Sequence, residues 1–304
     1  MPISRDDLLN WKFKDVEHSY TWRDAALYAL ALGVGGDPLD EDQLRFTFEK
    51  ELAVLPSMAV VLAYPGLWLS DPRTGADWRQ LLHGEQGVEL ERPLPVEACV
   101  IGRMKVLDVL DKGVDKGAHV LTERVLYDKA TGDRLARLTS TAILRADGGF
   151  GGPASGAPSA LRPTPDRRPD VTFDMPVLPQ AALLYRLLGD YNPIHADPAL
   201  ARDAGFDRPI LHGLCTFGIA GYALVRAVCE SVPERLTGMS ARFSAPAYPG
   251  ETIRTEIWLE ADAVRFRARA VERDVVVLSN GVAAIAANRH ARQAGALAKA
   301  GSLK

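Results

Sequence analysis

Residues 214–229 read LCTFGIAGYALVRAVC, a stretch whose apolar side chains would cover nearly every side of a helix. A helix that is apolar all round has to be buried, because no face of it suits water. Gly218 and Gly221 lie three residues apart and would let another strand or helix approach closely. We therefore expect one buried helix with other elements packed around it.

Runs of alternating apolar and polar residues on both sides of the middle of the chain predict antiparallel strands that could surround this helix. Turn residues at 111–113 and 131–133 separate the runs of the first half, as hairpin connections would. The expected strands are 97–113, 119–133 and 134–146 in the first half, and 251–263, 264–274 and 275–288 in the second.

The chain also repeats itself upstream of these strands. Residues 25–38, AALYALALGVGGDP, echo residues 181–193, AALLYRLLGDYNP, and residues 148–170 between the halves are rich in Gly, Pro and charge. We infer an α+β unit that occurs twice, as an N-terminal module at 1–147 and a C-terminal module at 171–304, joined by a linker at 148–170. Strands around one buried helix form a hot dog. Two antiparallel sheets, each wrapped around a helix, would make a double hot-dog fold, a pseudo-dimer in one chain.

Composition excludes several classes of protein. The 304 residues are 47% hydrophobic and 25% charged, which is ordinary for globular domains, and the net charge of −3 gives no general attraction to nucleic acid or anionic membranes. No apolar run reaches the length of a membrane span, and the start, MPISRDDLLNWKF, has no signal-peptide core. Three cysteines, an odd number in apolar settings, suggest free buried thiols in a reducing compartment. We expect a cytoplasmic protein.

A cluster of proton-active residues follows the second repeated helix. Asp190 and His195 lie five residues apart, and Pro193 stiffens the loop between them. A carboxylate and an imidazole held together can move protons on one water molecule, and Asn192 could orient that water. On local spacing alone, the alternative is equally good: Asp190 and Asn192 could simply form turns around a loop histidine.

The start of the buried helix favours the chemical interpretation. Gly213 follows His212 at the helix N-terminus, where the first amides have no partner within the helix and carry the positive end of its dipole. A glycine amide there could stabilise negative charge on a carbonyl oxygen, although Gly213 could also serve only to begin the helix. Asp190, His195 and His212 could bind a metal, but no HExxH or paired-cysteine spacing supports it, so we expect none.

Residues 189–198, GDYNPIHADP, followed by 210–218, ILHGLCTFG, resemble the signature of type 2, or R-specific, enoyl-CoA hydratases of the MaoC-like hot-dog superfamily. Residues 81–95, LLHGEQGVELERPLP, and 242–258, RFSAPAYPGETIRTEIW, extend the resemblance to two-module members such as the hydratase part of the peroxisomal multifunctional enzyme type 2. The resemblance implies reversible hydration of trans-2-enoyl-CoA to (3R)-3-hydroxyacyl-CoA without cofactor or metal.

The resemblance also implies residue roles. Asp190 and His195 would be catalytic with Asn192, and the Gly213 amide would hold the thioester oxygen. Positions expected to bind the acyl-CoA substrate are His83, Gly84, Lys112, Tyr191, His212, Phe243 and Glu49. From the residues alone, Lys112 could instead be a solvated turn lysine, Phe243 a core aromatic and Glu49 a surface residue.

Several features stay open at this level. Residues 55–68, LPSMAVVLAYPGLW, are the first half's counterpart of the buried helix and look individual to this chain, which leaves the acyl-chain preference undefined. The alternatives are a hydro-lyase for branched, carboxylated or carrier-protein-bound acyl thioesters, then an acyl-CoA thioesterase or an acyl-CoA-binding module. We expect acyl-CoA as partner, no nucleic acid or membrane, and a possible homodimer.

Overall fold

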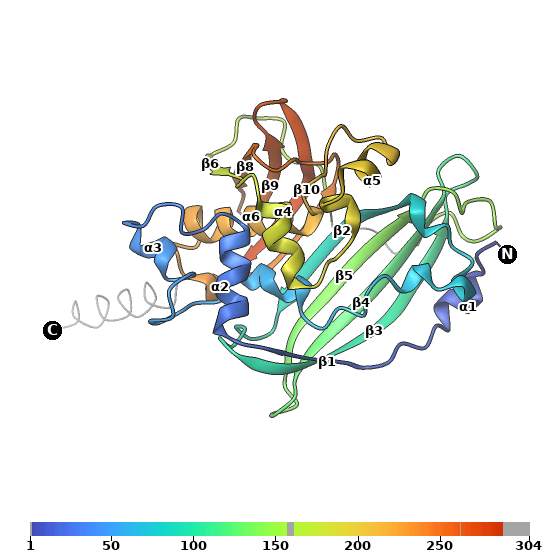
Figure 1. Cartoon of the computed structure of the whole chain (residues 1–304), viewed down its shortest axis with the longest axis horizontal. Helices are drawn as coiled ribbons and strands as arrows, with labels where there is room; N and C mark the ends of the chain where they lie inside the picture. Colours follow the sequence, from blue (N-terminus) through green and yellow to red (C-terminus); the bar gives the residue numbers. More distant parts are fainter. Residues whose placement is uncertain (1, 157–160, 262, 288–304) are drawn as a thin grey trace.

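The computed structural model describes residues 2–156, 161–261 and 263–287 and contains one antiparallel sheet of ten strands (Figure 1). Its order is β1-β3-β4-β5-β2-β7-β10-β9-β8-β6. The strands are β1 (Val16–Tyr20), β2 (Leu81–Leu90), β3 (Ala98–Asp111), β4 (Ala118–Asp128), β5 (Arg134–Leu144), β6 (Val171–Pro176), β7 (Leu236–Phe243), β8 (Thr252–Leu259), β9 (Val264–Ala270) and β10 (Val275–Ile285). The six strands expected from alternation are all present, whereas β1, β2, β6 and β7 were not expected.

The strand order reads the same from both edges of the sheet. Counted inward, the first half runs β1, β3, β4, β5, β2 and the second half runs β6, β8, β9, β10, β7. This symmetry confirms the duplicated unit and the double hot-dog fold with its pseudo-dimer arrangement. The expectation of two separate sheets is corrected. β2 and β7 pair directly, with Val88 opposite Met239, so that the open edge of each half is satisfied by the other.

The predicted buried helix is α6 (Gly213–Ala227), and eleven of its residues, from Cys215 to Val225, are buried without a break. It packs against strands of its own half and against the first half's η1 (Pro56–Val61), a 3-10 helix. Gly218 and Gly221 allow the close approach expected of them. A Cβ at Gly218 would lie 2.6 Å from the Tyr28 hydroxyl, and one at Gly221 would lie 3.1 Å from Ser57.

The first half has no long helix where its counterpart of α6 was expected. Residues 55–68 are buried for most of their length, but their only helices are η1 and the first residue of the short η2 (Trp68–Ser70). Pro65 would break a longer helix, because it lies within ten residues of the start of η1, and the β-branched pair Val60–Val61 disfavours a helix before it. The expectation of a helix inside each half is therefore correct only for the second half.

Two helices join the halves on one side of the sheet. α2 (Trp22–Ala31) packs against α4 (Ala181–Tyr185), and the rings of Tyr28 and Tyr185 lie 6.0 Å apart. These are the two segments whose sequences echo each other. The remaining helices are α1 (Arg5–Leu9), α3 (Glu41–Leu44), α5 (Pro198–Asp203) and the 3-10 helices η3 (Pro72–Thr74), η4 (Trp78–Gln80), η5 (Arg186–Leu188), η6 (Pro193–His195) and η7 (Pro233–Arg235).

The segment between the halves contains no helix or strand in its described residues, 148–156 and 161–170. Its first residues are nevertheless held in place, because the amides of Gly149 and Gly151 each donate to the Asp111 carboxylate at 2.7 Å. The module boundaries at 147 and 171 stay a prediction.

Two further expectations concern free thiols and membrane spans. All three cysteines are free thiols, with Cys215 and Cys229 buried and Cys99 partly exposed. No helix within the described part of the chain is both long and apolar enough to cross a membrane.

We expect Gly218→Val to lower the free energy of unfolding by about 1–3 kcal/mol, because the added atoms would overlap the buried Tyr28 and Leu32. Urea unfolding followed by circular dichroism measures this change. The control is Gly36→Val, where a Cβ meets its nearest neighbour at 3.4 Å. Equal stability of the two variants would contradict close packing of α6 against α2.

Candidate active site

Asp190 is placed by the end of the second repeated helix. α4 tightens into η5, and Gly189 ends it with φ of +111°, a left-handed conformation that suits glycine. The chain then turns sharply, and Asp190 Oδ1 accepts a hydrogen bond from the Asn192 amide at 3.2 Å. Asn192 Oδ1 in turn accepts from the Ile194 amide at 3.2 Å. Both turns foreseen as the simpler alternative are thus present, and each leaves one polar side-chain atom available for other contacts.

His195 ends η6 and is 8% exposed. Its Nδ1 lies 2.9 Å from the carbonyl oxygen of Ile210. A carbonyl can only accept, so Nδ1 carries the proton and Nε2 keeps a free lone pair. Burial lowers the pKa of His195, while the Ile210 hydrogen bond and the charge of Asp190 raise it. The net lowering keeps this imidazole neutral and able to accept a proton near neutral pH.

His212 caps the N-terminus of α6 and is 1% exposed. Its Nε2 donates to the backbone oxygen of Asp190 at 3.2 Å, and its ring stacks on that of His195 with centroids 3.7 Å apart. Burial, and then the neighbouring His195, lower the pKa of His212 to about 4. These contacts place the ring behind Asp190 and His195, where it supports the loop.

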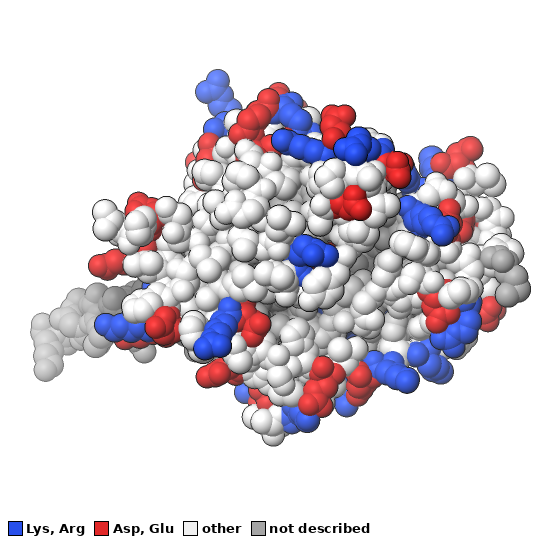
Figure 2. All heavy atoms as spheres, in the orientation of Figure 1, with Lys and Arg blue, Asp and Glu red and all other residues white. Residues whose placement is uncertain are grey.

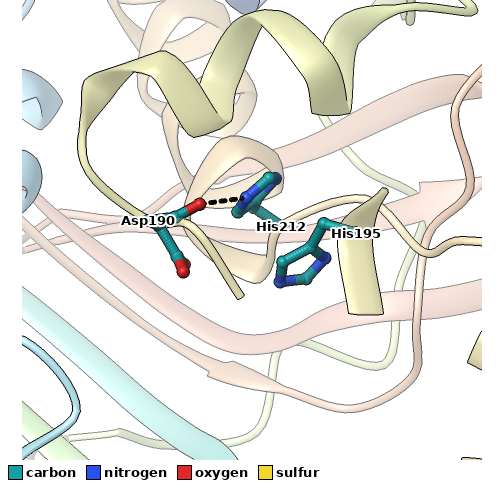
Figure 3. Close-up of side chains that lie close together, drawn as sticks. All are labelled: Asp190, His195 and His212. Atoms are coloured by element: carbon teal, nitrogen blue, oxygen red, sulfur yellow. Dashed lines mark hydrogen bonds between the residues drawn. The ribbon is translucent and has the colours of Figure 1, made fainter. Parts of the chain in front are cut away.

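Figure 3 shows the Asp190 carboxylate and the His195 imidazole pointing to the same side of the loop, with His212 above them. One ligand-type atom from each of the three residues lies within 4.8 Å of the others. The spacing is compatible with a water molecule shared by Asp190 and His195. It is also compatible with a metal ion, although His212 Nε2 is already used by the Asp190 backbone.

The first half of the chain contributes residues to the same place. The His83 ring on β2 lies 4.5 Å from that of Phe243 on β7, and a Cβ at Gly213 would come within 3.2 Å of Phe243. Burial lowers the pKa of His83 to about 4, and the Asp190 charge acts on it in the opposite direction. Ser140 lies 3.2 Å from His83 Nε2. The pairing of β2 with β7 therefore brings His83, Phe243 and Gly213 together.

Gly213 is the first residue of α6. The amides at this end of a helix have no acceptor inside it and carry partial positive charge. The adjacent Phe243 ring leaves no room for a side chain at this position.

Tyr191 borders a cavity of about 210 Å³ between the halves. Its ring is 61% exposed, and the Arg186 guanidinium lies 5.5 Å from it. Other residues around the cavity are His18, Met58, Leu62 and Leu188. In the view of Figure 2 most charged side chains lie towards the rim, and few lie over the middle of this face.

Three predicted substrate contacts are exposed or have structural partners. Glu49 is exposed in a turn after α3, and α3 lies beside the far end of α6, where Asp40 pairs with Arg226. Glu49 itself is exposed, and its contact with substrate stays a prediction. Lys112 donates to the Ala154 carbonyl at the end of β3. The space beside Gly84 is taken by Ile143, 2.8 Å from where a Cβ would be.

Two members of the cluster were missed from the sequence. The Ile210 carbonyl holds His195, and a backbone acceptor leaves no signal in residue type. The ring of Tyr185 lies 5.0 Å from that of His212 and supports it from the other side. Tyr185 falls within the repeated helix, and its inward position could have been found from the helical spacing of that segment.

The fold and the cluster define the class of protein: a double hot dog in which Asp190, His195 and His212 gather beside the N-terminus of α6, the longest helix among the described residues. The chain matches the MaoC like domain over residues 160–281 and the MFE-2 hydratase 2 N-terminal domain over residues 18–146. It belongs to the MaoC-like, enoyl-CoA hydratase 2 family.

Relatives and a solved structure agree with this assignment. The chain is 37% identical over 295 residues to the peroxisomal enoyl-CoA hydratase 2 of Arabidopsis thaliana, covering 92% of this chain and 95% of the relative. It is 41% identical over 271 residues to 3-hydroxyacyl-thioester dehydratase Y of Mycobacterium tuberculosis, covering 87% and 89%. A MaoC-like dehydratase structure from Phytophthora capsici has a TM-score of 0.82 and 34% identity, covering 93% of this chain and 99% of that one. Hydratases and dehydratases of this kind are lyases.

We expect His212 to remain neutral down to about pH 4 and His195 to titrate below its ordinary value of 6.5. A pH titration of the imidazole Cε1–H resonances by NMR measures both, with His212→Gln and His195→Gln used for assignment. A His212 midpoint near 6.5 would mean that the ring is not buried against Asp190 and His195.

Proposed function

We propose that the protein adds water reversibly to trans-2-enoyl-CoA and forms (3R)-3-hydroxyacyl-CoA. The observation that carries this proposal is the convergence of Asp190, His195 and the N-terminus of α6 in one site. The names of its relatives support the same reaction, since they are enoyl-CoA hydratases and a 3-hydroxyacyl-thioester dehydratase.

In the proposed mechanism, Asp190 and His195 act on one water molecule. His195 Nε2 is the acceptor because its Nδ1 is engaged with Ile210. As the water oxygen bonds to C3, the pair takes a proton from the water and C2 gains one, so that both residues return to their starting state. Asn192, through its side-chain amide, helps to orient the water. His212 is a positioning residue that holds the Asp190 backbone.

Charge that develops on the thioester oxygen during this addition needs a hydrogen-bond donor. The Gly213 amide at the start of α6 is suited to that role, because the helix dipole adds to its positive charge. His83 and Phe243 would lie along the bound substrate, and Tyr191 at its entrance. No cofactor or metal takes part in this scheme.

Other aspects of the assignment are also proposals. Free buried thiols support a reducing compartment, and we propose the cytoplasm, although the Arabidopsis relative is named peroxisomal. β1 and β6 are the outer strands of the sheet and offer edges through which a homodimer could form. We place Lys112 near the CoA phosphates only as a secondary proposal.

Loss of the enoyl absorbance of trans-2-butenoyl-CoA and trans-2-decenoyl-CoA tests the function, with chiral analysis of the product. We expect a (3R)-hydroxyacyl product and no effect of a metal chelator. Release of free CoA would instead indicate a thioesterase, and binding without turnover would indicate an acyl-CoA-binding module. Strong inhibition by the chelator would show that Asp190, His195 and His212 hold a metal.

We expect Asp190→Asn to lower kcat by at least about 10²-fold, because the amide keeps the turn but cannot exchange a proton. His195→Gln should do the same, measured as initial rates with unfolding midpoints in parallel. The matched control is Asp197→Asn, since Asp197 caps α5 and asparagine caps a helix equally well. Near-normal turnover by Asp190→Asn would remove Asp190 from the mechanism.

A further inference from the structure

The inner face of β4, which faces η1, is not uniformly apolar. Ala118 and Val120 belong to one hydrophobic cluster and Leu126 belongs to the other, larger one. Between them on the same face lie Thr122 and Arg124, both buried. The polar interruption continues across the sheet, because Thr122 is opposite Ser140, and Ser140 contacts His83 at the candidate active site.

Arg124 is 8% exposed and has few partners for a buried cation. Its Nη2 donates to the Val60 carbonyl of η1 at 2.7 Å, while Nε and Nη1 are buried without a hydrogen bond to any described residue. Within residues 2–156, 161–261 and 263–287, no carboxylate forms an ion pair with it. Burial lowers the pKa of Arg124 to about 10, which leaves it charged at neutral pH. A buried charge without an anion destabilises a fold strongly.

The comparison with Arg265 shows that this arrangement is not general for buried arginines in the chain. Arg265 is 7% exposed, and its Nη2 donates to two carbonyl oxygens, those of Arg162 and Pro163. Its Nε is the one buried nitrogen of this side chain without a hydrogen bond to a described residue.

Tyr64 stacks on the Arg124 guanidinium. The Arg124 guanidinium carbon lies 5.3 Å from the centroid of the Tyr64 ring, and Tyr64 is 48% exposed. Desolvation raises the pKa of the Tyr64 hydroxyl, the charge of Arg124 lowers it, and the charge of Asp190 raises it. The half-exposed Tyr64 ring is thus a cover of the guanidinium that also borders solvent.

We propose that Arg124 binds a carboxylate at the far end of the acyl chain and makes the protein selective for carboxylated trans-2-enoyl thioesters. The inference rests on the proposed hydratase function and deepens it. Apolar clusters on both sides of Thr122 and Arg124 would pack the methylene groups of the chain, and the guanidinium would pair with its terminal charge. The phosphates of CoA are the other anions that the substrate could supply.

The test compares trans-2-enoyl-CoAs that end in a carboxylate with methyl-ended thioesters of the same length, over a series of lengths. We expect the wild-type protein to have a higher kcat/KM for the carboxylated member at one or more lengths. Arg124→Met should lower that value about tenfold or more, and change the value for the methyl-ended member little. Arg124→Lys keeps the positive charge but loses the two-pronged guanidinium geometry, so it should retain part of the preference for the carboxylated substrate. Arg265→Met is the control and should keep it.

Several results would overturn the inference. Equal losses on both series in Arg124→Met would show that Arg124 only positions η1 and Tyr64. If Arg124→Met lowers kcat/KM for CoA thioesters but not for pantetheine thioesters, the anion that Arg124 binds is a phosphate of CoA. If the wild-type protein hydrates methyl-ended substrates and shows no preference for a carboxylate, the inference about Arg124 is wrong, while the proposed hydratase function stands. Failure to hydrate either series would overturn the proposed function and this inference together.

Discussion

The burial of α6 is the constraint on which the other parts of the structure depend. Its residues from Cys215 to Val225 have no exposed face, so strands from one half and η1 from the other must cover it. Two glycines bring α2 and η1 into direct contact with it, which ties the halves together at the centre. The pairing of β2 with β7 then continues the sheet from one half to the other. A pseudo-dimer joined in this way has one core.

The same helix positions the chemistry. His212 is the N-cap residue of α6 and donates to the backbone of Asp190, so a hydrogen bond ties the start of the helix to the loop that carries Asp190. His195 is fixed to Ile210, two residues before that cap. Asp190, His195 and Gly213 are therefore positioned by hydrogen bonds within about twenty-five residues of sequence, whereas His83 reaches them only because β2 lies beside β7.

These differences explain what could be predicted from the sequence. Alternation revealed the long strands β3, β4 and β5 and their counterparts, because one face of each is buried. It did not reveal β1 and β6, which are short edge strands, or β2, where the bulge between His83 and Glu85 interrupts the period. Local spacing identified Asp190 and His195. The contact predicted for Glu49 stays a prediction, because sequence carries no measure of how far the exposed segment after α3 lies from Gly213.

The two halves of the chain differ most in the helix that packs on the inner face of the sheet. The face of β9 that packs against α6 carries Phe266, Ala268 and Ala270, all of them apolar. An apolar helix offers no hydrogen-bond partner to a charged side chain on that face. The corresponding strand β4 reaches the six-residue η1 through the hydrogen bond from Arg124 to Val60, and a short 3-10 helix covers less of a sheet than α6 does. On that face Arg124 is buried with the Val60 carbonyl of η1 and the Tyr64 ring as its partners. The two halves thus share one strand order, but only the second covers its strands with a long helix, and the proposed division of roles between substrate recognition and acid–base chemistry follows that difference.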